Sequence, residues 1–361
     1  MPQTNPSTTK APPEDLLWVD VARVIAMWSV VVIHVAADVI TEWGTLPNSW
    51  WGAANFYDSL ARGPVAIFIM LSGALLLPQA ESYRAFFRKR FGRVLIPFLA
   101  WSLFYLLWRR HFYEPTLGPA EMLRRFATDR VYFHLWFMYV LIGLYLITPW
   151  LRVLVANASK KDLGYFLGLC FLVSFLLPFV ESLAGLVGHP FHIKLVIEPV
   201  QGFVGYFVLG YFLRKYASEK TVPTAWLVWG LSLLVCFFGT AWACARIHSF
   251  STIFYDNMAP NHLFFAAAFF ILLKQASPMM GKKVTGRWRR MTGLVAGASF
   301  GIYLIHPTFI DVLNHGRWGF TLRSNIWHPA FIIPFVASTV YFLSLLAVLL
   351  IQRIPILRRT V

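Results

Sequence analysis

The sequence predicts an all-α, polytopic integral membrane protein: a helical bundle of about ten transmembrane helices with both termini in the cytoplasm. The 361-residue chain is 58% hydrophobic and 13% charged, whereas soluble domains carry roughly 45–50% apolar and about 25% charged residues. Apolar runs of bilayer-spanning length recur along the chain without alternating in polarity, which indicates helices rather than strands. Lysine and arginine gather in alternate connections, as in loops that stay on the cytoplasmic side.

Ten candidate spans follow from length and apolarity, and the sixth and eighth are the shortest. We place them at residues 18–38, 63–77, 94–108, 132–153, 163–180, 200–213, 225–244, 262–273, 294–313 and 330–351. Residues 1–15 are polar and proline-rich and lack a signal-peptide pattern, so we expect a disordered cytosolic tail there. Residues 16–361 then form one transmembrane domain.

The basic residues indicate which partners to expect. The formal net charge is +16, but the cations lie in short connections between apolar runs, which favours the lipid bilayer or a cytosolic anionic ligand over nucleic acid. The connection at residues 109–130 mixes arginine with glutamate on the opposite side, and we expect a short surface helix there. All three cysteines lie within apolar runs, so we expect neither disulfides nor a metal site.

The first span carries ionisable residues, which are costly inside a bilayer. Arg23 and His34 are eleven positions apart. This is about three helical turns, so the two side chains share one face and are separated by a rise of roughly 16 Å. Arg23 then lies near the cytoplasmic end and His34 lies deep in the membrane. The alternative is an interfacial Asp20–Arg23 pair with His34 as a hydrogen-bonded packing residue.

Two further imidazoles are expected at a similar depth. His134 opens the fourth span, and His306 lies in the outer half of the ninth span, three residues after Tyr303. Their alternatives are an interfacial residue for His134 and a structural hydrogen bond for His306, because Pro307 leaves backbone groups without partners.

A cationic group is expected at the cytoplasmic mouth of the bundle. Arg90 and Arg93 are i,i+3 neighbours leading into the third span, and with Arg23 they form a candidate phosphate-binding pocket. Ordinary retention of positive charge in cytoplasmic loops also explains Arg90 and Arg93.

Five motifs together carry a resemblance to a known family. They are Arg23-x10-His34 preceded by Asp20, Phe68-x3-Ser72-Gly73, Arg90-x2-Arg93 followed by Pro97, His134-Leu-Trp-Phe, and Tyr303-Leu-Ile-His306-Pro307. In this order and spacing they resemble the membrane-bound acyltransferase 3 family from about Leu17 to Ile351. The resemblance is greatest to the short, single-domain surface-polysaccharide O-acetyltransferases, including the enterobacterial-common-antigen type.

The resemblance implies a bacterial inner-membrane enzyme that takes an acyl group from cytosolic acetyl-CoA. The acceptor is a hydroxyl of a surface polysaccharide or lipid-linked sugar. It also implies functional roles for Arg23, His34, Arg90 and Arg93.

The residues and the resemblance agree on one geometry. Arg23, Arg90 and Arg93 hold the phosphates of acetyl-CoA, and the acyl arm reaches His34. The imidazole of His34 serves as general base or takes the acyl group itself, and the sequence leaves both routes open. His306 or His134 orients His34 or stabilises the oxyanion, with Tyr303 as a further candidate.

Several points remain open at this stage. The candidate carboxylate partners of His34 are Asp38, Asp311 and Glu198. A transporter or flippase of a lipid-linked or small polar substrate is the alternative function, since intramembrane arginine and histidine suit that class too. A sensor or scaffold explains the matched depths of the imidazoles less well.

Overall fold

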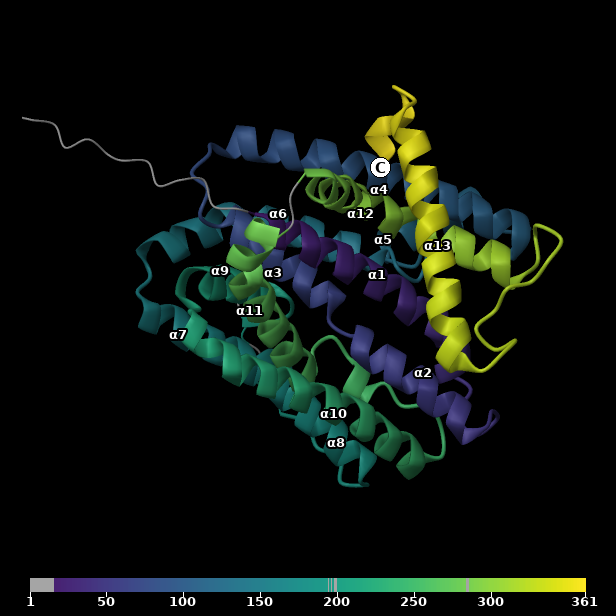
Figure 1. The fold of residues 1–361 in the computed structure, drawn as a ribbon, viewed down its shortest axis with the longest axis horizontal. Helices are drawn as coiled ribbons and strands as arrows, with labels where there is room; N and C mark the ends of the chain where they lie inside the picture. The colour runs from purple at the N-terminus through teal and green to yellow at the C-terminus, as the bar shows by residue number, and fades with distance from the viewer. Residues whose placement is uncertain (1–15, 194, 196, 198–199, 284–285) are drawn as a thin grey trace, which may run out of the picture.

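The computed structural model describes residues 16–193, 195, 197, 200–283 and 286–361, and every regular element in this part of the chain is helical. The predicted tail at residues 1–15 lies outside the described residues. The α-helices (Figure 1) are α1 (Leu17–Ile40), α2 (Asn48–Ala61), α3 (Pro64–Leu76), α4 (Tyr83–Phe112), α5 (Pro119–Ala127), α6 (Trp136–Asn157), α7 (Lys160–Cys170), α8 (Leu177–Leu186), α9 (Val204–Tyr216), α10 (Val222–Ile247), α11 (Pro260–Lys283), α12 (Gly286–Asn314) and α13 (Pro329–Gln352). The predicted all-α membrane bundle is confirmed.

Nine helical segments within the described residues are long and apolar enough to cross a membrane, against about ten predicted. The difference is α9, at the predicted sixth span, which has only 13 residues. Its length of about 20 Å falls short of the roughly 30 Å hydrocarbon core. The predicted surface helix between the third and fourth spans is present as α5. Large apolar side chains such as Leu99, Leu103 and Leu107 on α4 are exposed, as lipid contact requires.

The second span differs from its prediction because it begins earlier and is broken. A single apolar segment runs from Asn48 to Leu76, but α2 ends before Arg62 and α3 starts at Pro64. Gly63 joins them with φ +123°, a conformation that L side chains rarely adopt. Pro64 suits the first turn of α3, where a backbone N–H would have no partner. The break therefore lies within the bundle, beside the cavity described below.

Two glycines hold the short helices α3 and α9 together. A Cβ added at Gly73 would lie 1.8 Å from the carbonyl oxygen of Phe207, and one at Gly210 would lie 1.9 Å from that of Met70. The helices therefore approach backbone to backbone, as small residues allow in membranes. This contact supports the wall of the bundle that carries Ser72.

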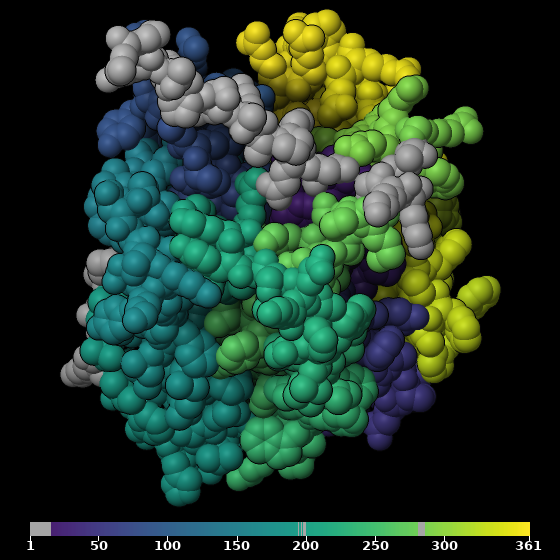
Figure 2. All heavy atoms as spheres, turned by 60° about the vertical axis from the view of Figure 1, so that its left-hand side comes forward, coloured from purple at the N-terminus to yellow at the C-terminus, as the bar shows by residue number. Residues whose placement is uncertain are grey.

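Helix α1 runs through the centre of the bundle, packed against α2, α3, α11, α12 and α13. Its residues Trp18, Met27 and Val31 are almost completely buried. Leu16 and Val361, near the two ends of the described chain, line the same cavity, so both ends lie on one face of the molecule. The C-terminal residues form the right-hand part of the upper edge in Figure 2. That this face is cytoplasmic stays a prediction.

Candidate active site

A cavity of about 960 Å³ penetrates the bundle and is lined by α1, α3, α4, α6, α12 and the end of the chain. Six of the seven site residues predicted from the sequence line it, namely Arg23, His34, Arg90, Arg93, His134 and Tyr303. The seventh, His306, is fully buried directly behind His34. Helices far apart in the sequence thus bring the predicted cations and imidazoles into one space.

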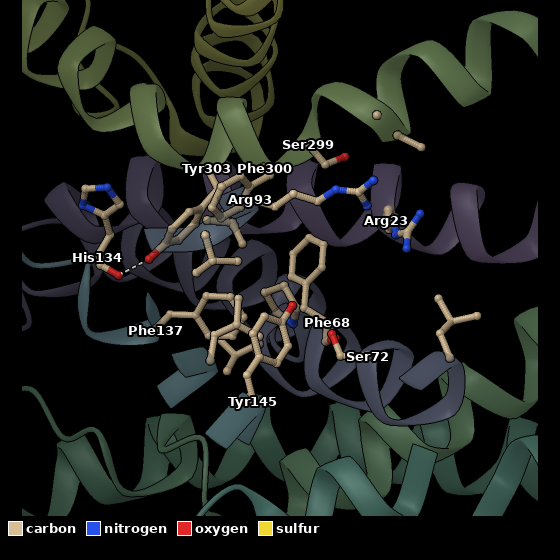
Figure 3. Close-up of a pocket in the computed structure, with 18 of the residues that line it drawn as sticks. Arg23, Phe68, Ser72, Arg93, His134, Phe137, Tyr145, Ser299, Phe300 and Tyr303 are labelled. Carbon is tan, nitrogen blue, oxygen red and sulfur yellow. Dashed lines mark hydrogen bonds between the residues drawn. The ribbon is translucent and has the colours of Figure 1, made fainter. Parts of the chain in front are cut away.

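The cations stand at one end of this cavity. Nη1 of Arg23 lies 3.3 Å from Oδ1 of Asp20, and Nη2 of Arg90 lies 3.8 Å from Oε1 of Glu81. The Nε of Arg90 is buried and has no hydrogen-bond partner among the described residues. Figure 3 shows the side chains of Arg23 and Arg93 directed toward the same part of the pocket. Two paired arginines and Arg93 therefore surround the entrance on the side of the two chain ends.

Two further arginines, which the sequence does not predict at this site, lie at the same entrance. Arg358 and Arg359 also line the cavity, although the sequence suggests only retention of cytoplasmic charge for them. They belong to a helical turn at Leu357–Thr360, and the indole Nε1 of Trp101 on α4 donates to the carbonyl of Thr360 at 2.8 Å. We call Arg23, Arg90, Arg93, Arg358 and Arg359 the basic mouth. Arg358 and Arg359 belong to it only because the C-terminal turn packs against α4 beside the cavity.

At the deeper end, His34 and His306 form a hydrogen-bonded pair. Their nearest nitrogens, His34 Nδ1 and His306 Nε2, are 2.7 Å apart, and the rings are nearly parallel at 4°. The other nitrogen of His306, Nδ1, lies 2.8 Å from the carbonyl oxygen of Tyr303 and 3.1 Å from that of Ile302. A carbonyl oxygen only accepts, so Nδ1 of His306 carries a proton.

This proton fixes the tautomer of the pair. In neutral His306, Nε2 is then an acceptor and Nδ1–H of His34 donates to it. The remaining nitrogen of His34, Nε2, has a free lone pair. The reason lies in the sequence, because Pro307 has no N–H for the carbonyl of Tyr303 four residues earlier. That carbonyl is left for His306, and the arrangement makes Nε2 of His34 a base or nucleophile.

His134 and Tyr303 contact this pair without bonding to His34. The ring of His134 lies 5.6 Å from that of His306, and within the described chain neither of its nitrogens has a hydrogen-bond partner. The hydroxyl of Tyr303 donates to the backbone carbonyl of His134, as the dashed line in Figure 3 marks. His306 is therefore the imidazole that directly contacts His34, and the hydroxyl of Tyr303 is already engaged.

The candidate carboxylates make other bonds. Asp38 accepts from the side-chain amide of Asn314 at 2.8 Å, and Asp311 accepts from the indole of Trp108 and from Arg317. Neither forms a hydrogen bond with His34. Glu198, the third candidate, lies outside the described residues.

The cavity wall also contains a buried ion pair that the sequence does not predict there. Arg62 lines the cavity and donates from Nε to the fully buried Asp58 at 2.8 Å. Its guanidinium also lies 4.2 Å from the ring centre of Tyr255 and donates to that residue's carbonyl. The signal was the i,i+4 spacing of Asp58 and Arg62. It went unused because the predicted span began at Gly63.

The far end of α4 carries a separate charge cluster on the surface. Arg125 and Arg109 both donate to Glu114, and these bonds lower the pKa of Glu114 to about 2. Arg109 of this cluster lies 16 positions after Arg93 of the basic mouth on α4, a rise of roughly 24 Å along the helix. The cluster fastens α5 to the end of α4, away from the cavity entrance.

No group of three histidine, cysteine or acidic side chains suited to a metal ion occurs among the described residues. Fold and cavity together define a multi-pass membrane protein with an internal cavity that has arginines at one end and histidines at the other. A family model described as an acyltransferase domain matches residues 16–351, and the chain belongs to this acyltransferase 3 family. No curated protein and no solved structure matches the chain.

Family membership gives the general activity. The protein is a membrane acyltransferase, and the acceptor class associated with the family is a glycan. This favours acyl transfer over the transporter or flippase alternative.

Proposed function

We propose that the protein transfers an acetyl group from cytosolic acetyl-CoA, across the bacterial inner membrane, to a hydroxyl of an extracytoplasmic surface glycan or glycolipid. Residues 16–361 act as one domain in this proposal. The observation that carries it is the single cavity shared by the arginines of the basic mouth and His34. Its volume of about 960 Å³ lies at the upper end of the usual range for small-molecule sites, roughly 300–1,000 Å³.

The donor would bind with its charged and acyl ends separated. The phosphates remain at the basic mouth, because arginine holds phosphate through forked, charge-assisted hydrogen bonds. The thin pantetheine arm extends along α1, from Arg23 toward His34. Their eleven-residue separation corresponds to a rise of roughly 16 Å. This division lets a nucleotide that cannot enter lipid deliver its thioester to a site within the membrane.

The chemistry then centres on Nε2 of His34. In the general-base route, Nε2 removes the proton of the acceptor hydroxyl as its oxygen attacks the thioester carbonyl. The tetrahedral intermediate collapses, the carbon–sulfur bond breaks, and the departing thiolate takes the proton from Nε2. Throughout, Nδ1–H of His34 remains bonded to His306, which stabilises the imidazolium.

The acyl-histidine route uses the same nitrogen. Nε2 attacks the thioester, CoA leaves as the thiolate, and the proton on Nδ1 can pass to Nε2 of His306 at 2.7 Å. The acceptor oxygen then attacks the acetyl carbonyl and the carbon–nitrogen bond to Nε2 breaks. The extra proton on His306 returns to Nδ1 of His34, and the proton of the acceptor hydroxyl passes to the CoA thiolate. Mass spectrometry of the protein after incubation with acetyl-CoA alone separates the routes, because only this one adds an acetyl group to His34.

Arg62 is the candidate donor to the developing oxyanion. A guanidinium has five N–H groups, and three of those in Arg62 are engaged by Asp58 and the carbonyl of Tyr255. The other two remain available in a side chain that lines the cavity. Fixed donors of this kind stabilise charge that appears only in the transition state.

The deciding experiment is mass spectrometry of candidate surface glycans after incubation with the protein and isotope-labelled acetyl-CoA. We expect label on a sugar hydroxyl with the wild-type protein and none with His34→Ala, although the variant inserts into the membrane normally. Wild-type rates from purified His34→Ala would refute the role of His34. Absence of labelled product from any envelope glycan would refute the proposed acceptor class.

A further inference from the structure

The five arginines of the basic mouth carry more positive charge than the neighbouring carboxylates neutralise. Arg23 faces Asp20, and Arg90 faces Glu81. Arg93, Arg358 and Arg359 form no ion pair with any acidic side chain of the described residues. Three uncompensated cations around one cavity entrance indicate an anionic ligand with more than a single charge.

The two arginines at the end of the chain are held in a defined place. The carbonyl of Thr360 accepts from Trp101 of α4 at 2.8 Å, and the backbone N–H of Arg358 donates to the carbonyl of Ile354 at 2.9 Å. The first bond and the packing of the turn on α4 hold it against the helix that also carries Arg90 and Arg93, and the second bond holds the turn itself. Arg358 and Arg359 are exposed, and they lie at the rim of the cavity rather than in its depth.

The phosphates of CoA lie in a fixed order along the molecule. The pantetheine arm leaves from the diphosphate, and the 3′-phosphate lies on the ribose beyond it. An arm that enters beside α1 therefore places the diphosphate near Arg23 and Arg93. The 3′-phosphate then falls farther out, at the rim. A terminal phosphate offers up to two charges and three acceptor oxygens, which suits two adjacent guanidinium groups.

We propose that Arg358 and Arg359 bind the 3′-phosphate of the acyl-CoA donor, and so select it over acyl donors that lack this phosphate. The inference rests on the proposed acetyl-CoA-dependent function and adds the element that recognises the donor. Free phosphate on a nucleotide and the phosphate of an anionic lipid share the same chemistry, so the test is arranged to separate them.

The experiment compares binding of CoA and 3′-dephospho-CoA to the full chain in nanodiscs of zwitterionic phosphatidylcholine. We expect the wild-type protein to prefer CoA by about tenfold, the size of one charge-assisted hydrogen bond. The double variant Arg358→Gln/Arg359→Gln should lose this preference and keep its affinity for 3′-dephospho-CoA. Arg353→Gln is the matched control, because Arg353 is exposed near the same end of the chain and does not line the cavity.

Each outcome has a definite meaning. A preference for CoA that survives in the double variant overturns the inference. An equal loss of affinity for both ligands in the double variant also overturns it. The two arginines would then bind the diphosphate, or attract any anion to the basic mouth, rather than recognise the 3′-phosphate. If anionic phosphatidylglycerol in the nanodisc abolishes the preference by competition at these arginines, a lipid headgroup is the true ligand. If the wild-type protein binds neither ligand, the proposed function fails as well.

Discussion

Replacing His306 by alanine tests the imidazole pair most directly. The substitution removes the acceptor that holds Nδ1–H of His34 at 2.7 Å. A hydrogen bond to a charged group contributes about 1.5–3 kcal/mol. Since every 1.4 kcal/mol is about tenfold, loss of this bond to the imidazolium should lower kcat by roughly 10- to 100-fold. The KM for acetyl-CoA should change little, because the basic mouth binds its phosphates.

The assay is steady-state acetyl transfer by purified protein, with kcat and KM determined separately. His306→Gln retains a side-chain oxygen that can accept from His34, and it should recover part of the lost rate. His262→Ala is the matched control, because His262 is another buried imidazole that contacts the thiol of Cys236 rather than His34. A kcat unchanged in His306→Ala, with the variant folded, would refute the positioning role of His306.

Three further predictions concern the packing, the surface cluster and the mouth. Gly73→Ala should lower the thermal unfolding temperature, because its Cβ would lie 1.8 Å from the carbonyl oxygen of Phe207 and overpacking costs about 1–3 kcal/mol or more. Gly230→Ala is the control: its Cβ would meet nothing within 4 Å, so the unfolding temperature should not fall. The pKa of Glu114 is lowered to about 2 from 4.5. The ionised carboxylate therefore stabilises the folded protein fully above about pH 4.5, and this contribution is lost as the pH falls toward 2. Across that window the wild-type protein should lose thermal stability more steeply than Glu114→Gln. Arg93→Ala should weaken acetyl-CoA binding most at low ionic strength, and a dissociation constant equal to wild type would exclude Arg93 from phosphate binding.

Site residues are predictable from the sequence where a single helix, or a shared depth in the membrane, determines their positions. Arg23 and His34 share a helix, so its period alone places both on the same cavity. The depth argument also brought His134 and His306 close to His34, but depth does not specify which side chains touch. That choice depends on the rotation of α12 against α1, which is set by packing between helices distant in sequence.

Other features depended on contacts that no local pattern contains. Asp58 on α2 and Arg62 just after it make this stretch look too polar for a span, and only their mutual bonds and Tyr255 make their burial tolerable. Arg358 and Arg359 resemble an ordinary basic tail until Trp101 is seen to hold their turn at the cavity. In both cases a contact between residues distant in sequence places the charged side chains at the cavity.

The last prediction follows from the role of one proline. Pro307 leaves the carbonyl of Tyr303 without its helical N–H donor, and His306 bonds that oxygen through Nδ1 at 2.8 Å. Pro307→Ala restores the N–H, which then competes with His306 for the same oxygen. The helix should become no less stable, since a proline in a helix interior costs about 3 kcal/mol.

The acetyl-transfer rate of Pro307→Ala should nevertheless fall, because the proton on Nδ1 of His306 is less firmly held and the basic nitrogen of His34 is less well defined. The fall should be smaller than for His306→Ala, since the carbonyl of Ile302 remains 3.1 Å from Nδ1. Thermal unfolding and kcat measured on the same preparation provide the test. A variant with wild-type kcat would show that the free carbonyl of Tyr303 is not what sets the tautomer of the pair.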